Sequence, residues 1–195
     1  MRGRRLAGMA GLVLVLTGIW LVAGGGWIYA KAALAQNLLS RAWEQTLAGG
    51  VTVRPWPWAD TWPVARLRFP AAGRETIVLA GAQGASLAFG PGHVDGTPSP
   101  GAPGNSVIGG HRDTSFTVLG ALHDGDTMSL QTADGHWRSF SVIGNTIVDA
   151  RKEWHPPQPP EGLAMLTLVT CWPLDAIVPG GPLRYLVFAE ETLAR

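Results

Sequence analysis

The sequence predicts an all-β domain, a barrel or a sandwich, that follows an apolar N-terminal helix. From Val64 onward, short apolar or alternating runs are separated by clusters of Gly, Pro, Asn and Asp, which is the pattern of strands joined by turns. Ahead of them, residues 6–30 carry no charged side chain. With 195 residues, of which 46% are hydrophobic, the chain is long enough for one domain with a core and an additional apolar segment.

Charge and cysteine content exclude several classes of function. The formal net charge is +1, and no basic run follows the first five residues, so we expect no nucleic-acid partner. Cys171 is the only cysteine. It therefore makes no intrachain disulfide, four-sulfur zinc site or Cys-x-x-Cys redox pair, and any chemistry it has is that of a single thiol.

The apolar segment at residues 6–30 is expected to be a transmembrane anchor. As a helix it would be about 37 Å long, enough to span a bilayer with some tilt. The basic tip at residues 1–5 holds more positive charge than Lys31 and Arg41, which predicts a cytoplasmic N-terminus and an external domain. An Ala-x-Ala site would allow cleavage after Ala35, but the apolar region exceeds the roughly 7–15 residues of a signal peptide, so we expect an uncleaved anchor.

Residues 31–63 are expected to form a helical stalk and a Trp/Pro-rich linker ahead of a domain at residues 64–195. Apolar residues recur at near-helical spacing and the pattern stops at two glycines: Leu34, Leu38, Trp43, Leu47, then Gly49 and Gly50. In the linker, the prolines lack the backbone N–H groups that the regular hydrogen bonding of a β-sheet requires. Its tryptophans Trp56, Trp58 and Trp62 either pack against the domain or the membrane interface, or form a lid over a site.

Seven strands are expected in the domain. They are residues 65–70, 75–81, 105–111, 127–132, 137–150, 164–171 and 182–190. A short helix or turn is expected within residues 116–126. In the strand at 164–171, alternation places Leu166 and Leu168 on one face, and Met165, Thr167, Val169 and Cys171 on the other.

Cys171 ends its strand, just before Pro173. A free cysteine is often a small buried hydrophobe. A reactive one needs an accessible, electropositive setting, for which a histidine and an arginine are the candidate helpers. Both interpretations stay open at this point.

His111 and Arg184 are the best candidates for these helpers. His111 ends a predicted strand after two glycines, where a side chain can project beside closely approaching backbone. The other histidines lie in turn-like or polar contexts and are expected to be solvated: His93, His123, His136 and His155. Arg184 brings a charge into an apolar strand, so it is either functional or ion-paired with Asp175 or Glu190.

Together these residues resemble a known family. "PGAPGNSVIGGHRDTSFTVLGALHDGDTMSL", "LTLVTCWP" and "LRYLVFA", in this order, are similar to the sortases, membrane-anchored cysteine transpeptidases. The resemblance covers residues 64–190 and implies a closed β-barrel with short helices or turns. The Trp/Pro lead-in and "TCWP" are most similar to the gram-negative, proteobacterial sortases, which implies an inner-membrane protein with its catalytic domain in the periplasm.

The resemblance also implies a reaction. A Leu-Pro-x-Thr-Gly-like (LPxTG-like) C-terminal sorting signal of a target protein would bind as an extended peptide and be cleaved between Thr and Gly. Cys171 would form a thioacyl intermediate that an amine acceptor resolves, His111 would act as general acid and base, and Arg184 would stabilise the oxyanion. Thr170 is a further candidate for substrate binding. Asp113 is expected to orient Arg112 or His111, or to serve a turn or an ion pair.

Some sortases bind calcium through acidic residues in the loop before the cysteine strand. That loop offers only Glu153 and Glu161 here, so we expect no metal and no cofactor. Two alternatives remain: a catalytically inactive, membrane-tethered β-domain that binds an extended peptide, and another Cys/His acyl-transfer enzyme such as an L,D-transpeptidase. The latter pattern places an arginine two residues after the cysteine, where this sequence has Pro173 after Trp172.

Overall fold

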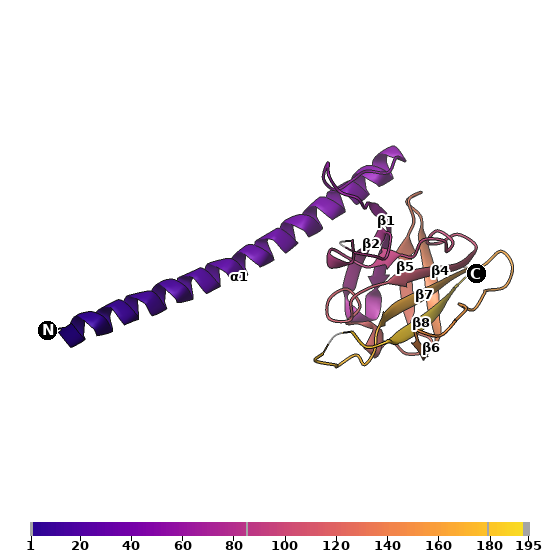
Figure 1. The fold of residues 1–195 in the computed structure, drawn as a ribbon. Coiled ribbons are helices and arrows are strands. Elements are labelled where there is room, and N and C mark those ends of the chain that lie inside the picture. The colour runs from indigo at the N-terminus through magenta and orange to yellow at the C-terminus, as the bar shows by residue number, and fades with distance from the viewer. Residues whose placement is uncertain (1, 85, 179, 193–195) are drawn as a thin grey trace. The chain divides into compact units, whose positions relative to one another are not determined.

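A computed structural model describes residues 2–84, 86–178 and 180–192, and shows one long helix and eight strands in this part of the chain (Figure 1). The elements are α1 (Arg2–Gly49), β1 (Pro63–Phe69), β2 (Arg74–Ala80), β3 (Gly92–His93), β4 (Gly104–Gly109), β5 (Thr127–Gln131), β6 (Trp137–Asp149), β7 (Ala164–Cys171) and β8 (Leu183–Glu191). Short 3-10 helices occupy Pro70–Ala72, Ser86–Ala88 and Leu119–Ala121. All seven expected strands are present, and only the two-residue β3 was not expected.

The chain divides into two compact units, Met1–Asn37 and Leu38–Arg195. The first consists of the N-terminal part of α1, which contains the segment expected to span a membrane. By length and composition, α1 is able to cross a bilayer.

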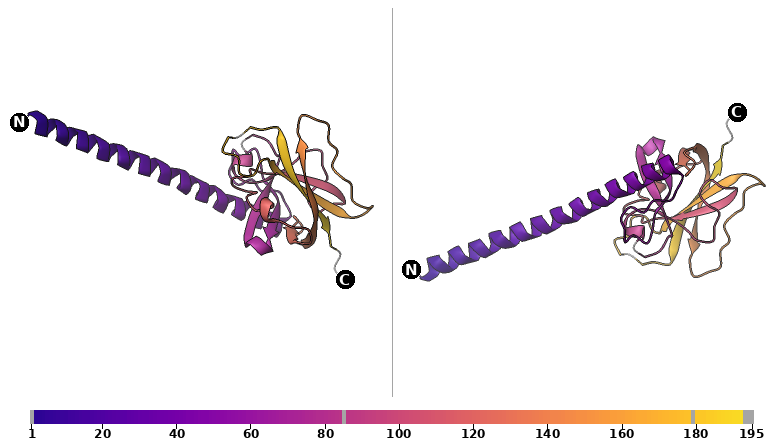
Figure 2. Two further views of the ribbon diagram at one scale, coloured as in Figure 1. Left: turned by 90° about the horizontal axis from the view of Figure 1, so that it is seen from below. Right: turned by 90° about the horizontal axis from the view of Figure 1, so that it is seen from above.

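The second unit is built on a closed β-barrel, as expected. Its strand order is β1-β2-β3-β4-β7-β8-β6-β5, and β5 pairs with β1 to close the barrel. Two neighbouring pairs are parallel, β2 with β3 and β4 with β7, and the others are antiparallel. Figure 2 shows the same elements from below and from above.

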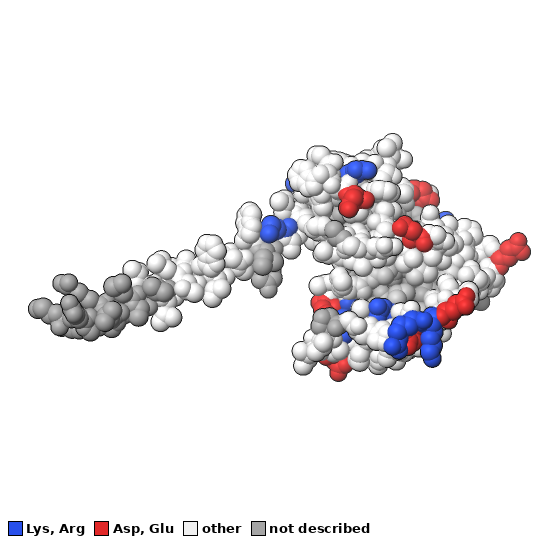
Figure 3. All heavy atoms as spheres, in the orientation of Figure 1, with Lys and Arg blue, Asp and Glu red and all other residues white. Residues whose placement is uncertain are grey.

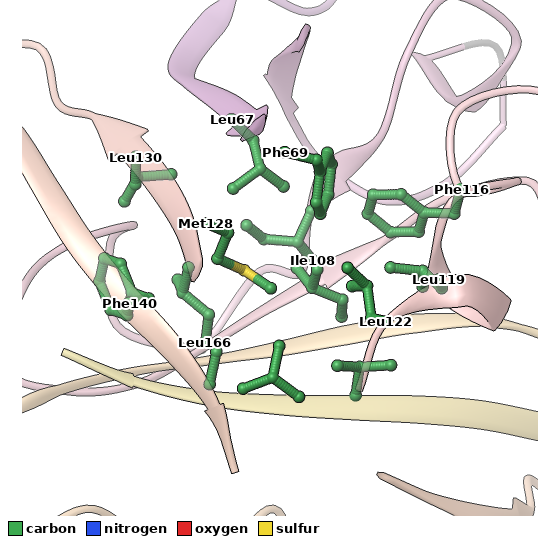
Figure 4. Close-up of a cluster of buried hydrophobic side chains, with 14 of the residues drawn as sticks. Leu67, Phe69, Ile108, Phe116, Leu119, Leu122, Met128, Leu130, Phe140 and Leu166 are labelled. Atoms are coloured by element: carbon green, nitrogen blue, oxygen red, sulfur yellow. The ribbon is translucent and has the colours of Figure 1, made fainter. Parts of the chain in front are cut away.

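The core fills the barrel interior with apolar side chains from most of the strands (Figure 4). In β7, Leu166 and Leu168 belong to this core whereas Met165 and Thr167 do not, so the two faces expected from alternation are confirmed. Full burial of one such apolar side chain contributes about 1.5–3 kcal/mol.

A second apolar cluster attaches the end of α1 to the outside of the barrel. Leu39 and Trp43 pack on Ile77 and Leu79 of β2, and all four are buried. The Trp43 indole Nε1 donates to Gln131 Oε1 at 3.1 Å. The compact unit therefore starts at Leu38 and includes part of the segment expected to be a stalk, because one face of that helix buries on the sheet.

The three linker tryptophans lie in different surroundings. The Trp56 ring meets the Phe89 ring edge to face, with centroids 5.0 Å apart. Trp62 accepts a backbone hydrogen bond from Ala80 at 2.8 Å, whereas Trp58 is 82% exposed. Packing against the domain thus describes the Trp56 side chain, whereas Trp62 is half-buried and tied to β2 through its backbone. On the face shown in Figure 3, acidic and basic side chains are interspersed.

Candidate active site

Parallel pairing of β4 with β7 brings His111 and Cys171 to the same end of neighbouring strands. Gly109 is paired with Val169, so His111 and Cys171 each lie two residues beyond a paired position. The ladder continues past β4, because the Gly110 N–H donates to Val169 O at 3.0 Å. The Thr170 hydroxyl then donates to Gly110 O at 2.8 Å. The backbone that carries His111 is therefore bound to the strand that carries Cys171.

The second glycine of the Gly-Gly-His sequence is required by packing. A Cβ atom at Gly110 would lie 2.7 Å from Cδ2 of the buried Phe116 ring. The Phe116 N–H also donates to His111 O at 2.9 Å, which closes the turn. Phe116 thus occupies the inner side of this turn, and the His111 side chain is exposed on the other.

Arg184 reaches the site through the antiparallel pair of β7 and β8. It lies directly opposite Cys171, and Cβ atoms of opposite residues are about 4.5–5.5 Å apart in such pairs. The Arg184 Nη1 donates to the carbonyls of Gly181 at 2.7 Å and Leu183 at 2.9 Å. Within the described residues, Nε and Nη2 have no acceptor, and no carboxylate pairs with Arg184. The ion pair considered as an alternative, with Asp175 or Glu190, is thus not formed in this part of the chain.

A small pocket of about 60 Å³ lies at this end of the strands. It is lined by His111, Arg112, Asp113, Cys171 and Gly180. Cys171 is half-buried and lines the pocket, so its sulfur is more accessible than that of a packed core cysteine. None of the linker tryptophans lines this pocket, so the structure offers no support for a tryptophan lid over it.

Arg112 and Asp113 contribute to the pocket in unequal ways. The Arg112 side chain is buried, and its guanidinium is bonded to carbonyls of the loop that follows Cys171. Asp113 is exposed and pairs with Arg112 Nε at 3.3 Å. Of the roles considered for Asp113, the structure thus shows the contact with Arg112. Sequence reasoning did not find the role of Arg112 itself or of Gly180.

Three of the four remaining histidines are exposed as expected: His123, His136 and His155. The expectation for His93 is wrong. It lies in β3 and is half-buried, and its Nε2 is hydrogen-bonded to Pro98 O at 2.9 Å and to Thr97 Oγ1 at 3.0 Å. A tight turn after β3 brings these two oxygen atoms back to the ring, so both hydrogen-bond partners of Nε2 come from the loop that follows His93.

The outer face of β4, β7 and β8 is covered in part by the proline-rich loop before β7. Asn105 of β4, which is buried, donates from Nδ2 to Pro157 O at 2.6 Å and accepts from Thr167 Oγ1 at 2.9 Å. The Trp154 ring stacks on Phe188, with centroids 6.4 Å apart. These contacts hold the loop over the first half of β7, because Asn105 is paired with Met165 and Phe188 with Thr167.

Two of the acidic residues near this loop, Asp149 and Glu153, have basic partners. Arg151 pairs with Asp149 at 2.7 Å, and its hydrogen bonds lower the pKa of the Asp149 carboxyl to about 2. Glu153 lies 3.5 Å from His155 Nε2. In the described ranges, no three His, Cys, Asp or Glu side chains are grouped as a metal would require.

Comparison with known proteins agrees with this geometry. The Sortase domain family model matches residues 67–192. Sortase D of Bacillus subtilis (strain 168) is 28% identical over 125 residues, which cover 64% of this chain and 62% of that protein. The chain thus matches about three fifths of the length of this relative.

Solved structures show the same fold. Sortase A from Corynebacterium diphtheriae aligns with a TM-score of 0.61 and 24% identity, over 71% of this chain and 64% of that one. Sortase C-1 from Actinomyces oris aligns with a TM-score of 0.56 and 27% identity, over 68% of this chain and 76% of that one. Because the family model covers more than half of the chain, the protein belongs to the sortase family. This assignment argues against the L,D-transpeptidase alternative.

Proposed function

We propose that this protein is a membrane-anchored sortase that cleaves an LPxTG-like sorting signal between Thr and Gly and transfers the target protein to an amine acceptor. The family and the fold support a cysteine transpeptidase that processes sorting signals. The observation that carries the finer proposal is that β4, β7 and β8 bring His111, Cys171 and Arg184 to one end of three neighbouring strands.

Cys171 is the nucleophile in this proposal. Its thiolate attacks the carbonyl carbon of the Thr residue, and a C–S bond forms. The tetrahedral intermediate collapses as the C–N bond to Gly breaks. The C-terminal fragment leaves as an amine, and the target protein remains attached to Cys171 as a thioester. The position of the sulfur at the lining of a pocket supports this role.

His111 moves the protons of both half-reactions. It donates one to the departing amine nitrogen and accepts one from the incoming amine as that nitrogen attacks the thioester. The new C–N bond forms while the C–S bond breaks, and the thiolate of Cys171 is regenerated. An exposed imidazole at the mouth of the cysteine pocket suits this exchange.

Arg184 stabilises the negative charge on the tetrahedral oxygen. A guanidinium stays cationic and presents several donors in a fixed plane. Its Nε and Nη2 have no acceptor among the described residues, whereas all three nitrogens of Arg112 are bonded. Arg184 is therefore the better candidate of the two arginines near Cys171.

The sorting signal would lie as an extended peptide on the outer face of β4, β7 and β8, beside the proline-rich loop. The loop is fastened to this face by Asn105, so it offers a wall that is present before the peptide binds. Thr170 is buried, and its hydroxyl is bonded to Gly110. A contribution of Thr170 to substrate binding would therefore come from its backbone.

The location proposed is the plasma membrane, with α1 as a single anchor and the barrel on the extracytoplasmic side. The length and apolar composition of α1 and the arginines at its start support this orientation. The similarity of "TCWP" to proteobacterial sortases makes that membrane an inner membrane and the compartment a periplasm.

The test is cleavage of a fluorogenic Leu-Pro-x-Thr-Gly peptide, with mass spectrometry of the protein to detect a thioacyl adduct on Cys171. We expect an adduct and a transferred product when an amine is added. Cys171→Ala should abolish both while the peptide still binds. A barrel that binds the peptide without any adduct, with a thiol inert to alkylation, would favour the inactive peptide-binding domain instead.

A further inference from the structure

Arg112, the residue after His111, has a buried guanidinium with every nitrogen engaged. Its side chain is 7% exposed. Nη1 donates to Pro173 O at 2.6 Å, Nη2 donates to Ala176 O, and Nε lies 3.3 Å from the Asp113 carboxylate. Hydrogen bonds from a charged donor are stronger than neutral ones, and the flat fork of arginine suits two acceptors at once.

Both carbonyls belong to the loop that joins β7 to β8, residues 172–182, which starts directly after Cys171. Apart from Arg112, the loop is held at its two ends: the Leu174 side chain packs against the barrel core and closely approaches Gly120, and Gly181 O accepts from Arg184 Nη1. Beyond Ala176, the chain is open to solvent: Ile177 is 98% exposed and Val178 is 77% exposed. Gly180 of the same loop lines the pocket at Cys171.

The strand positions of the reactive groups do not depend on this loop. Cys171 and Arg184 lie opposite each other in paired strands, and the backbone before His111 is held by Thr170 and Val169. The Arg184 Nη1 also donates to Gly181 O of the loop at 2.7 Å, but Gly181 lies next to β8, five residues beyond Ala176. Of the residues that line the pocket, Gly180 is the one that belongs to the loop. A loss of the Arg112 contacts would therefore release a wall of the pocket and leave the strand positions of Cys171 and Arg184 in place.

We propose that Arg112 is a positioning residue that fastens the β7–β8 loop to the segment carrying His111, and so preforms the wall of the pocket that receives the sorting signal. The substrate part of this inference rests on the function proposed above. Its consequence is a specific kinetic pattern, because a wall that must be ordered by the peptide lowers affinity more than it lowers the rate of the chemical step.

The experiment compares full-length wild type with Arg112→Ala and Arg112→Lys in detergent. Arg138→Ala is the matched control, because Arg138 is a half-buried arginine that pairs with Glu191 at 2.9 Å and does not line the pocket. Hydrogen–deuterium exchange of residues 172–182 and alkylation of Cys171, the only thiol, are measured without substrate. The kcat and KM for the fluorogenic peptide are measured in parallel.

In Arg112→Ala we expect faster exchange in residues 172–182, alkylation faster by about fivefold, and a KM raised by about tenfold with kcat within about threefold of wild type. Arg112→Lys should lie between, since one ammonium cannot reproduce the fork. Arg138→Ala should leave exchange in the loop and alkylation unchanged.

Two results would overturn the inference: unchanged exchange and alkylation in Arg112→Ala with only a lower melting temperature, or a fall in kcat at constant KM. If wild type fails to cleave the peptide, the proposed function fails. Loop exchange and alkylation then still decide whether Arg112 fastens the loop.

Discussion

Cys171 and Arg184 lie directly opposite each other in the antiparallel pair of β7 and β8, so the spacing of their Cα and Cβ atoms is set by backbone hydrogen bonds. The backbone position of His111 is set by a second group of strand hydrogen bonds, because β4 runs parallel to β7 and ends beside it. Three chemically different side chains are thus placed at one end of three neighbouring strands. Such placement on strands favours precise geometry over adaptability.

Arg184→Ala should lower kcat by about a hundredfold to a thousandfold, because the oxyanion loses its charged donor. Arg184→Lys should recover only part of this, since a point charge lacks the guanidinium fork. Turnover of the fluorogenic peptide measures both. Arg151→Ala, which removes an exposed arginine paired with Asp149, is the control. Near-wild-type turnover of Arg184→Ala would refute the oxyanion role.

His111→Ala should reduce the rate of thioacyl formation by about a hundredfold or more, because the departing amine loses its proton donor. Quenched-flow mass spectrometry of the Cys171 adduct measures this step directly. His123→Ala removes an exposed imidazole that does not line the pocket, and it should react like wild type. Equal adduct formation in both variants would exclude His111 as the general acid.

Thr170→Val should lower kcat several-fold at constant KM and destabilise the fold by about 0.5–1.5 kcal/mol, because the Gly110 carbonyl loses its hydroxyl donor and the backbone before His111 loosens. Thr170→Ser keeps the hydroxyl and should retain activity. Kinetics and urea unfolding of the same samples separate the two effects. A raised KM with an unchanged kcat would instead indicate a substrate contact by the side chain.

A chain starting at Leu38 should unfold at about the same temperature as residues 38–195 do in the full-length protein. A chain starting at Val51 should unfold at a distinctly lower temperature. The shorter chain lacks Leu39 and Trp43 and exposes Ile77 and Leu79, and loss of a buried Trp alone typically costs about 3–5 kcal/mol. Thermal unfolding by circular dichroism measures both. In the full-length chain Trp43→Ala should reproduce the loss, whereas Trp58→Ala, at an exposed position, should not. Equal stability of the two truncated chains would show that the helix end adds nothing to the domain.

The full-length chain should stay in the membrane fraction after a high-salt wash, because ions do not screen apolar insertion. Immunoblotting of washed membranes measures this, and a version lacking residues 1–37 is the soluble control. Recovery of a soluble product that starts at Gln36 would show instead that the segment is a cleaved signal peptide.

Local patterns in the sequence predicted much of the fold and of the site. Alternation along residues 164–171 gave the inward and outward faces of β7 correctly, because the two-residue period of a strand is a property of the backbone itself. His111, Cys171 and Arg184 were selected from strand ends and from the family resemblance. The structure brings Cys171 and His111 into one pocket and pairs Cys171 with Arg184.

Other features depend on partners that carry no sequence signal. The periodicity of Leu38, Trp43 and Leu47 predicted an apolar helix face, but not that β2 would cover it from Leu39 onward. His93 was misjudged because its acceptors are a nearby carbonyl and a hydroxyl that only a tight turn brings back.

The sequence by itself determined the strand pattern and the apolar helix, since these follow from the period and chemistry of neighbouring residues. Its resemblance to the sortases selected the candidate reactive side chains. Only the tertiary structure decided which strands lie side by side and what Arg112 holds. Its acceptors are backbone carbonyls 61 and 64 residues away. Every residue has a backbone carbonyl, so the sequence does not indicate which two the guanidinium binds. The pairing of β4, β7 and β8 in the folded barrel decides it.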